Sequence, residues 1–380
     1  MDAHRIETRQ AIQHLYVGGH VDDAADQMAA LIQSHPDAPS LDEYKLLSLF
    51  HYAKRDYRHA IESLRQTHLL FPDDVDTAQN IGRLLLATGR ATEALVWLER
   101  VHRVRPDTPS IHDGLAEVYG RLGNRVRARY HGERSLTLKD GLAAERTAIC
   151  AMPDTPPPPF RQDHPRRNII AFSLWGNQAR YINGAIRNAE LARQIYPGWR
   201  CRFYCGRSVP GPAVAALLAA KAEVIIREQT GAFLEGLFWR FDVAFDPAVD
   251  RFLVRDADSV IGPREAAAVA DWLRGPKPFH LIRDYFTHTD LMLAGLWGGT
   301  GGILPDLAPH YAPYLQNTAK TFNSDQQFLG AVVWPAIRKH ALVHDSCFRA
   351  NGSHPFPADA PVTPGRHVGQ NASVHATPPG

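Results

Sequence analysis

Two aspartates separated by one residue stand directly after a short apolar run. Asp256 and Asp258 follow residues 252–254, which read Phe-Leu-Val, and Arg255 precedes them. Side chains at positions i and i+2 of an extended segment point to the same side, so the two carboxylates are expected to converge where a strand passes into a loop. Carboxylate oxygens suit Mg²⁺ and Mn²⁺. The spacing therefore predicts a divalent-cation site of the kind that binds a diphosphate.

The motif alone is weak evidence, because Asp-x-Asp occurs about once or twice by chance in a chain of this size. Asp74 and Asp76 have the same spacing, but they follow Pro72 between two helical segments. That pair is interpreted as a solvated turn. The apolar run before Asp256 is what distinguishes the second pair.

Two further charged residues are candidates for this site. Arg240 precedes the acidic strand and could pair bidentately with a phosphate or with a site carboxylate; the alternative is a surface salt bridge with a nearby aspartate. His344 follows the apolar residues 341–343, so it could be a third metal ligand at a strand end, which would favour manganese. The alternatives are that Asp345 has this role, or that His344 only forms hydrogen bonds.

Residues 173–177 follow the first predicted strand of the second half of the chain. Open α/β sheets bind nucleotides at the carboxyl ends of their strands, which makes Ser173, Trp175 and Gly176 candidates for a nucleotide site. Trp175 could stack on a base, or it could belong to the core. Gly176 would allow close approach of the backbone to a ligand.

A repeat of 34 residues organises residues 1–150. Ala60, Ala94 and Ala128 recur at this spacing, and so do Pro72 and Pro106. A period of 34 is typical of stacked helix-turn-helix units, and the pattern resembles the tetratricopeptide repeat. Such a solenoid normally binds a peptide or a partner protein; the alternative is that it only braces the rest of the molecule.

The sequence changes character over residues 151–167, which contain four consecutive prolines. Because such a run favours an extended spacer, we interpret it as a linker. Residues 168–350 then alternate between short apolar segments and amphipathic ones, which predicts an α/β, Rossmann-like, mainly parallel sheet with helices on both faces. The tail, 351–380, is rich in Pro, Gly and His and is expected to be irregular. Strands are expected at 168–174, 202–205, 223–226, 251–254 and 279–282, and helices at 178–196, 212–222 and 263–274.

Composition sets limits without choosing a function. Lys and Arg number 42 against 40 Asp and Glu, so the net charge of +2 gives no support for nucleic-acid or anionic-membrane binding. The sequence shows neither a signal peptide nor a membrane span. Four scattered cysteines fit a reducing compartment, which predicts a cytoplasmic protein.

Several blocks in the second half carry a resemblance when they are taken in order. Residues 168–370 resemble a GT-A-type nucleotide-sugar glycosyltransferase, and more closely a group of bacterial and viral glycosyltransferase-like proteins. The blocks are Phe172-Ser173-Leu174-Trp175-Gly176, residues 196–204, Phe238-Trp239-Arg240-Phe241, residues 249–259, Gly295-Leu296-Trp297-Gly298-Gly299, residues 325–329 and His344-Asp345-Ser346.

The resemblance implies metal-dependent transfer of a sugar from a nucleoside-diphosphate donor to a saccharide, lipid-linked or protein acceptor. Mn²⁺ or Mg²⁺ would bind Asp256 and Asp258, while Arg240 and Arg255 would help to bind the donor. Asp325 would face the acceptor. Its position at a helix start could lower its pKa, which favours orienting the acceptor over deprotonating it. The sugar and acceptor pocket is expected from Arg283, Asp284, His288, Trp297 and Gly298.

Two other functions compete with this one. The chain could be a non-catalytic repeat scaffold with a degenerate transferase domain. It could also be a phosphohydrolase that uses the first aspartate of Asp-x-Asp as a nucleophile. The second alternative is disfavoured, since the acidic pair follows three predicted strands instead of opening the domain.

Overall fold

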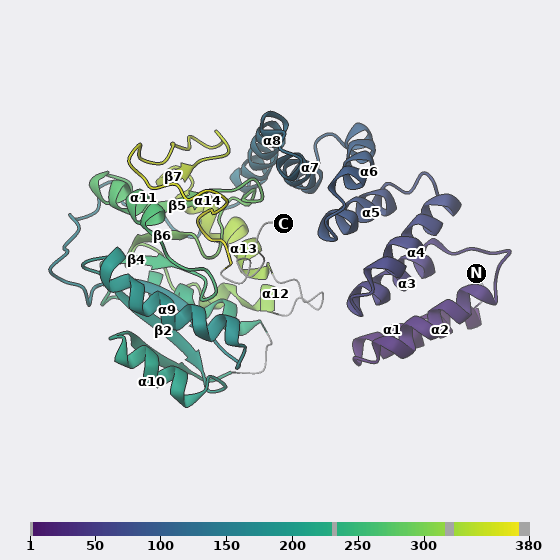
Figure 1. Cartoon of the computed structure of the whole chain (residues 1–380), viewed down its shortest axis with the longest axis horizontal. Helices are drawn as coiled ribbons and strands as arrows, with labels where there is room; N and C mark the ends of the chain where they lie inside the picture. The colour runs from purple at the N-terminus through teal and green to yellow at the C-terminus, as the bar shows by residue number, and fades with distance from the viewer. Residues whose placement is uncertain (1–2, 230–233, 316–322, 372–380) are drawn as a thin grey trace. The chain divides into compact units, whose positions relative to one another are not determined.

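The computed structural model describes residues 3–229, 234–315 and 323–371 (Figure 1). Contacts divide the chain into two compact units, Met1–Ser135 and Leu136–Gly380. This division falls earlier than the boundary predicted at residue 150. The predicted all-helical repeat region followed by an α/β region is confirmed. Among the described residues, no helix combines the length and apolar character needed to cross a membrane.

The first unit is built from antiparallel helix pairs. In three successive pairs, the first helix begins at residue 41, 75 or 109 and the second helix at residue 57, 91 or 125. Both sets of starts are 34 residues apart, which is the period seen in the sequence. Ala60, Ala94 and Ala128 are buried where paired helices approach. The helices are α1 Ala3–Val17, α2 Val21–Gln33, α3 Leu41–Ala53, α4 Tyr57–Leu70, α5 Val75–Ala87, α6 Ala91–Val104, α7 Pro109–Arg121 and α8 Arg125–Ala144.

Each turn within a repeat needs one residue in the left-handed region. Gly19, Gly89 and Gly123 have φ between 77° and 89°, and Arg55 takes the equivalent position with φ 61°. Asp74, the first residue of the other Asp-x-Asp pair, caps α5 by accepting a hydrogen bond from Thr77 N at 2.8 Å. That pair therefore has a local structural role.

The second unit contains a seven-stranded sheet in the order β3-β2-β1-β4-β6-β5-β7. β3, β2, β1 and β4 run parallel, β6 is antiparallel to both of its neighbours, and β7 is parallel to β5. From β1 the chain adds β2 and β3 on one side, and it then returns to add β4 on the other side of β1, so the strand order reverses between β1 and β4. The strands are β1 Asn168–Leu174, β2 Arg200–Gly206, β3 Glu223–Arg227, β4 Arg251–Val254, β5 Phe279–Arg283, β6 Trp297–Thr300 and β7 Ala341–Asp345.

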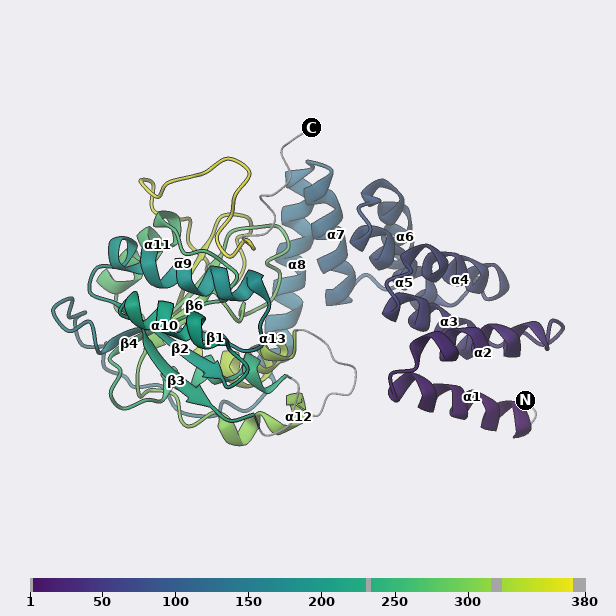
Figure 2. The ribbon, with the colours of Figure 1, turned by 60° about the horizontal axis from the view of Figure 1, so that its bottom comes forward.

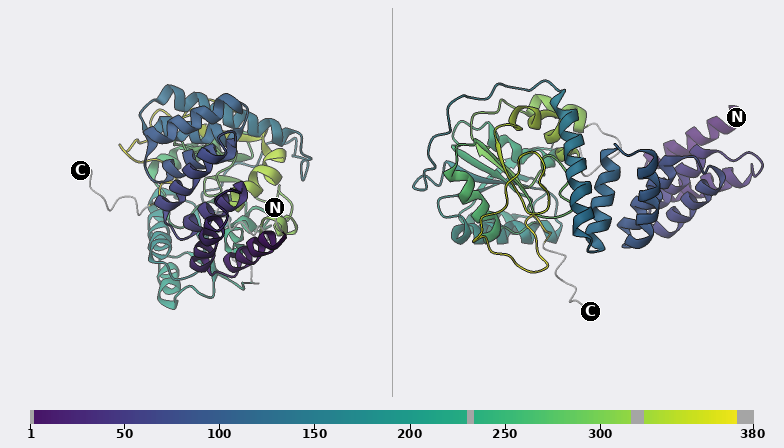
Figure 3. Two further views of the ribbon diagram at one scale, coloured as in Figure 1. Left: turned by 90° about the vertical axis from the view of Figure 1, so that its right-hand side faces the viewer. Right: turned by 90° about the horizontal axis from the view of Figure 1, so that it is seen from above.

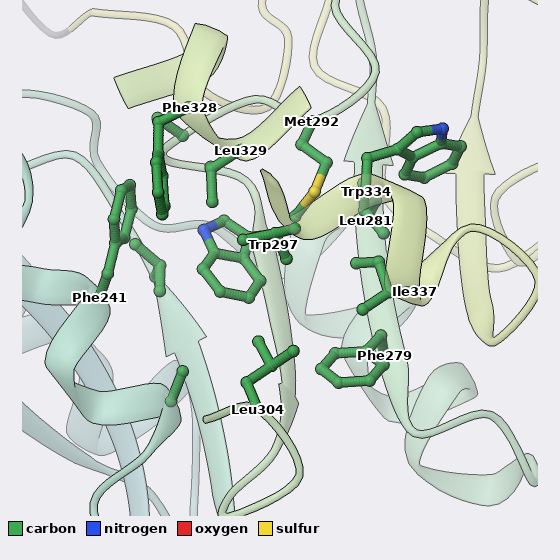
Figure 4. Packing of buried hydrophobic residues seen from close by; sticks show 14 of the residues in the cluster. Phe241, Phe279, Leu281, Met292, Trp297, Leu304, Phe328, Leu329, Trp334 and Ile337 are labelled. Atoms are coloured by element: carbon green, nitrogen blue, oxygen red, sulfur yellow. The ribbon is translucent and has the colours of Figure 1, made fainter. Parts of the chain in front are cut away.

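Helices cover both faces of this sheet (Figures 2 and 3). On one face, α9 Ala179–Ile195, α10 Gly211–Ala219 and α11 Pro263–Arg274 pack on alternate residues of β1, β2 and β4. The other face carries a core of large aromatic and aliphatic residues (Figure 4). The short elements on that side include η1 Glu235–Leu237, η2 Trp239–Ala244, η3 Ala308–His310, α12 Ala312–Leu315, α13 Ser324–Phe328, the π-helical η4 Leu329–Val333 and α14 Trp334–Ile337.

The end of α8 and the proline-rich segment belong to the second unit. Leu136 and Ala143 are buried in its core, and Asp140 accepts hydrogen bonds from Arg338 Nε at 2.8 Å and Trp334 Nε1 at 2.7 Å. Farther along, the Phe160 ring stacks on Trp199 at 5.5 Å. Residues 151–167, predicted as a linker, are therefore partly packed against the sheet domain.

Candidate functional site

The carboxyl end of β1 supplies one wall of a pocket. Ser173 Oγ accepts a hydrogen bond from the backbone N–H of Arg240 at 3.0 Å, which ties η2 to the strand end. Gly176 has φ 73°, and its N–H donates to Ser208 Oγ at 2.8 Å. Trp175 is half-buried and meets Trp239 edge to face at 6.2 Å. These contacts fix the turn after β1 and leave part of the indole of Trp175 exposed.

The acidic pair lies at the neighbouring strand end. β4 ends at Val254, and the carboxylates of Asp256 and Asp258 both reach the pocket. Asp258 Oδ2 accepts a hydrogen bond from Asn371 Nδ2 at 2.9 Å and lies 3.3 Å from the guanidinium of Arg180. Burial, together with the charge of Asp256, raises the pKa of Asp258. A cation between the carboxylates would relieve this repulsion.

Arg240 joins the acidic pair to Asp325. Its guanidinium pairs with Asp256 and, through the other terminal nitrogen, with Asp325 Oδ2 at 2.9 Å. Burial raises the pKa of Asp325 to about 6, although Arg240 opposes the shift. The pKa expected from a helix start was lower. The reason for the difference is the burial of the carboxylate, because its desolvation outweighs the favourable effect of the helix start.

Two glycines make room for the acidic loop. A Cβ at Gly295 would overlap the carboxylate of Asp256, and a Cβ at Gly184 of α9 would overlap the carbonyl of Ala257. Neither glycine has a positive φ, so space and not backbone conformation is what restricts these positions. Gly295 belongs to a block that the sequence singled out, whereas Gly184 has no local signal.

If Asp256 binds a divalent cation, Gly295→Ala should weaken manganese binding by at least about tenfold, the lower end of the loss seen when a group that orients a metal ligand is changed. The added methyl displaces Asp256, whose side chain is 42% exposed and can turn aside without unfolding the protein. Gly262→Ala is the matched control, since nothing lies within 4 Å of its Cβ. Equal manganese affinity in both variants would show that Asp256 does not bind the cation.

These groups surround one pocket of about 680 Å³. It contains two aspartates with two arginines beside them, one buried aspartate, one histidine and an aromatic wall. Its lining residues are Ser173, Leu174, Trp175, Gly176, Asn177, Gln178, Arg180, Tyr181, Leu234, Leu237, Arg240, Asp256, Ala257, Asp258, His288, Leu293, Ala294, Gly295, Leu296, Asn323, Asp325, Gln326 and Gly369. The sequence-predicted residues brought together here are Ser173, Trp175, Gly176, Arg240, Asp256, Asp258, Asp325 and His288.

Arg255 and His344 lie elsewhere. Arg255 is 2% exposed and donates to Glu265 at 3.1 Å and to the carbonyl of Trp297 at 3.1 Å, so its charge is used inside the fold. His344 is buried in β7, where it bonds His280 at 2.8 Å and Asp271 at 3.2 Å. Across residues 3–229, 234–315 and 323–371, no group of three or more His, Cys, Asp or Glu residues is arranged to hold a metal.

Most of the expected sugar pocket is structural. Trp297 belongs to β6 and is 1% exposed, packed among Phe241 and other core residues (Figure 4). Gly298 lies against β4, where a Cβ would overlap the carbonyl of Phe252. Arg283 donates to the carbonyls of residues 290 and 291. None of these three residues lines the pocket.

His288 does line the pocket, and Asp284 supports it from outside. The Asp284 N–H donates to His288 Nδ1 at 3.0 Å, and the Asp284 carboxylate accepts from Arg264 at 2.8 and 2.9 Å. Burial lowers the pKa of His288 to about 3, so the ring is neutral. A neutral ring that accepts at Nδ1 carries its proton on Nε2.

The sequence interpretation missed Arg180 and Asn371. Arg180 is the second residue of α9, close after the turn that follows β1, so its position in the sequence carried a signal. Asn371 lies in the Pro- and Gly-rich tail, far along the chain from Asp258. No local pattern predicts that contact.

Comparison with known proteins supports the first unit. Residues 51–118 match the family described as Tetratricopeptide repeat, so the N-terminal region carries tetratricopeptide repeats. No curated protein matches the sequence.

Solved structures give distant likenesses. MamA 41-end from Desulfovibrio magneticus RS-1 is 16% identical with a TM-score of 0.34, covering 36% of this chain and 77% of that chain. A MamA structure described as MSR-1 is 22% identical with a TM-score of 0.31, covering 34% and 73%. A Thermobaculum terrenum O-GlcNAc transferase mutant is 19% identical with a TM-score of 0.39, covering 60% and 42%. At these TM-scores the likenesses carry no argument about function.

Proposed function

We propose that the second unit is a glycosyltransferase domain of the GT-A type, which transfers a sugar from a nucleoside-diphosphate donor to an acceptor hydroxyl. The observation that carries the proposal is the pocket where the carboxyl ends of β1 and β4 meet. In an open α/β sheet, ligands bind where the strand order reverses, and β1 and β4 are the strands on either side of that point. The acidic pair lies at this reversal.

The residues at this site suit a divalent cation. Mg²⁺ and similar ions bind through one or two carboxylates and complete their coordination with phosphate oxygens and water, so no cluster of three protein ligands is needed. Asp256 and Asp258 would hold the ion. When bound, a divalent cation neutralises the charge that develops on a departing diphosphate.

The remaining residues have roles in binding the donor. Arg180 and Arg240 place guanidinium groups beside the acidic pair, where they can pair with phosphate oxygens. Trp175 offers an indole surface for the base at the end of β1. Ser173 holds η2, and with it Arg240, against this strand end. The Nε2–H of neutral His288 is a hydrogen-bond donor suited to a hydroxyl of the sugar or acceptor.

Asp325 is placed to act on the acceptor. Its carboxylate lines the pocket beside Arg240, which holds it in one orientation. With a pKa of about 6, it is mostly ionised at pH 7 and is a better proton acceptor than an ordinary aspartate. Asp325 can therefore orient an acceptor hydroxyl and receive its proton.

The tetratricopeptide repeats would recruit the acceptor or a partner protein. Repeat solenoids present an extended surface for such binding. The acceptor classes that remain open are a saccharide, a lipid-linked saccharide and a protein.

A donor screen tests the proposal. Hydrolysis of nucleoside-diphosphate sugars is measured with manganese and with excess chelator, for the wild type, Asp258→Asn and Asp76→Asn. We expect manganese-dependent hydrolysis of at least one donor and a loss of about a hundredfold in Asp258→Asn, the scale for removing one electrostatic contact to developing charge. Asp76 is the exposed member of the other Asp-x-Asp pair, so Asp76→Asn should behave as wild type.

Other outcomes identify the competing functions. Metal-dependent binding of a nucleoside diphosphate without turnover would favour a scaffold with a degenerate transferase domain. Hydrolysis of p-nitrophenyl phosphate but of no sugar nucleotide would favour a phosphohydrolase. Turnover of a donor that is unchanged by excess chelator would contradict the proposed role of the metal.

A further inference from the structure

The last described residues of the chain are attached to the acidic loop. Ser259, one residue after Asp258, forms an antiparallel bridge with Asn371, and Ser259 Oγ donates to the carbonyl of Gln370 at 3.4 Å. These contacts join positions more than a hundred residues apart in sequence. The C-terminal segment, defined here as His367–Asn371, therefore runs beside the loop that carries the acidic pair.

This segment is anchored at several points along its length. The Val368 N–H donates to Asp284 Oδ2 at 2.9 Å, and the Val368 side chain is buried with Leu296 and its neighbours. The ring of His367 stacks on Tyr285 at 4.1 Å with 12° between the planes. The segment is thus built into the second unit and does not lie loosely on its surface.

The C-terminal segment also forms part of the pocket wall. Gly369 lines the pocket, and a Cβ there would come within 2.8 Å of the Leu296 side chain. Its φ of 83° lies in the left-handed region, which favours glycine. Close approach and backbone conformation together bring Asn371 to the carboxylate of Asp258.

The contact between Asn371 and Asp258 leaves the carboxylate able to bind a cation. Asn371 Nδ2 donates to Asp258 Oδ2 at 2.9 Å, and Arg180 lies on the same oxygen at 3.3 Å. An ionised carboxylate has about four acceptor sites over two oxygens. The hydrogen bond from Asn371 and the charge of Arg180 both fall on Oδ2, so the carboxylate keeps further acceptor sites for a cation while its direction is fixed. Carboxylates that bind metals are commonly oriented by such outer hydrogen bonds.

We propose that Asn371 is a positioning residue, which orients Asp258 for the divalent cation, and that the C-terminal segment completes the cation and donor site. This inference rests on the proposed function, since it assigns a role to Asp258 in cation binding. It adds a residue from the opposite end of the domain sequence to the site. The cation site at the loop after β4 then includes a residue of the C-terminal segment.

Manganese binding to the full chain tests this assignment. Free Mn²⁺ is measured by electron paramagnetic resonance, first with manganese alone and then with uridine diphosphate or guanosine diphosphate present. We expect the Kd for manganese to rise about 10- to 100-fold in Asn371→Ala, the range for loss of an outer hydrogen bond to a metal ligand. Asn371→Leu keeps the approximate shape and removes the donor, so it should show the same loss.

Gln370→Ala is the matched control. Its side chain accepts a hydrogen bond from His367 N at 3.2 Å within the segment and does not contact Asp258 in the structure. The control should keep its manganese affinity within about twofold, because its side chain does not contact Asp258. The thermal midpoints of all variants should differ little, because a single hydrogen bond in a partly exposed segment contributes only about 1 kcal/mol to stability.

The outcomes separate the inference from the proposed function. If the wild type binds manganese and Asn371→Ala binds it equally well or more tightly, the positioning role is overturned and the proposed function stands. Equal losses in Asn371→Ala and Gln370→Ala would also overturn it, because the effect would then come from order in the segment. If the wild type binds no manganese with any nucleotide, the proposed function fails, and the inference fails with it.

Discussion

Replacing Arg240 with alanine is expected to lower the free energy of unfolding of the second unit by about 3–5 kcal/mol at a pH at which Asp325 is ionised in the variant, the cost of leaving a buried charge without its partner. The side chains of Arg240 and Asp325 are 5% and 6% exposed, so water cannot compensate for the loss. Urea unfolding followed by tryptophan fluorescence measures the effect. Every tryptophan except Trp97 lies in the second unit, so the fluorescence signal mainly reports the unfolding of that unit.

The loss in Arg240→Ala should depend on pH. Because burial raises the pKa of Asp325 above its unfolded value, the folded state binds more protons, and the stability contributed by this group falls as pH rises through the interval up to about 6. Arg240 holds that pKa down, so without Arg240 the pKa rises further. The charge-dependent part of the destabilisation is therefore fully present above the new pKa, shrinks as pH falls from the new pKa to about 6, and is lost below about 6, where Asp325 is protonated in both proteins.

Two variants test the cause of this loss. Asp325→Asn in the Arg240→Ala background should recover most of the stability, because the buried group is then neutral. Arg207→Ala removes an exposed pair with Glu228 and should change stability by at most about 1 kcal/mol. A loss in Arg240→Ala that is independent of pH and unrelieved by Asp325→Asn would show that packing, and not charge, is responsible.

Much of the architecture could be predicted because its signals are local. The 34-residue period fixes the helix starts, since each repeat places the same small and apolar residues at the same contacts. β1 was predicted with its observed bounds because five of its seven residues are apolar, as its burial along the whole length requires. β6 was not predicted. Its residues Trp297–Thr300 include two adjacent glycines and have the composition of a loop.

The packing around β6 explains why this strand exists. A Cβ at Gly299 would meet the rings of Phe279 and Phe252, so the glycines allow the aromatic residues of the flanking strands to lie against the β6 backbone. Strand formation here comes from tertiary contacts and not from propensity. The same packing buries Trp297, which therefore cannot offer its ring to a sugar.

The part of the site that lies at the ends of two adjacent strands could be predicted from the sequence. Residues after β1 and β4 meet because these strands pair directly. Asp256 and Asp258 both reach the pocket, but through a turn at residues 257–258 and not through the extended segment that the i, i+2 rule assumes. Arg255, the first residue after β4, points away from them and pairs with Glu265. His344 depends on the strand order, which sequence does not reveal. β7 is three strand spacings from β4, about 14 Å at 4.8 Å each.

The boundary between the units lies earlier in the chain than the sequence predicted, and this changes which residues the second unit needs in order to fold. The proline run suggested that a protein beginning near residue 166 would contain the whole second domain. Residues 136–165 instead contribute buried side chains, Leu136 among them, and the Asp140 contacts to Arg338 and Trp334. Arg161 adds a carbonyl that accepts a hydrogen bond from Asn168 Nδ2 at 2.8 Å. The second unit therefore needs this segment.

We expect a protein that comprises residues 136–380 to fold, and one that comprises residues 166–380 to be unfolded or to lack a cooperative transition. Loss of Leu136 alone should cost about 2–5 kcal/mol, because it is fully buried. The buried side chains and hydrogen bonds that residues 137–165 supply bring the total near the roughly 5–15 kcal/mol that stabilises a typical domain. Thermal unfolding followed by circular dichroism and tryptophan fluorescence compares the two proteins.

Asp140→Ala in the full chain isolates one contribution from this segment. It removes the acceptor of Arg338 and Trp334 and should lower the stability of the second unit by about 1–3 kcal/mol, the cost of leaving buried donors unsatisfied. Asp154→Ala is the control, since Asp154 is exposed in the same segment. If the protein that begins at residue 166 melts cooperatively at the same temperature as the one that begins at residue 136, then residues 136–165 are a dispensable connection, as the proline run suggested.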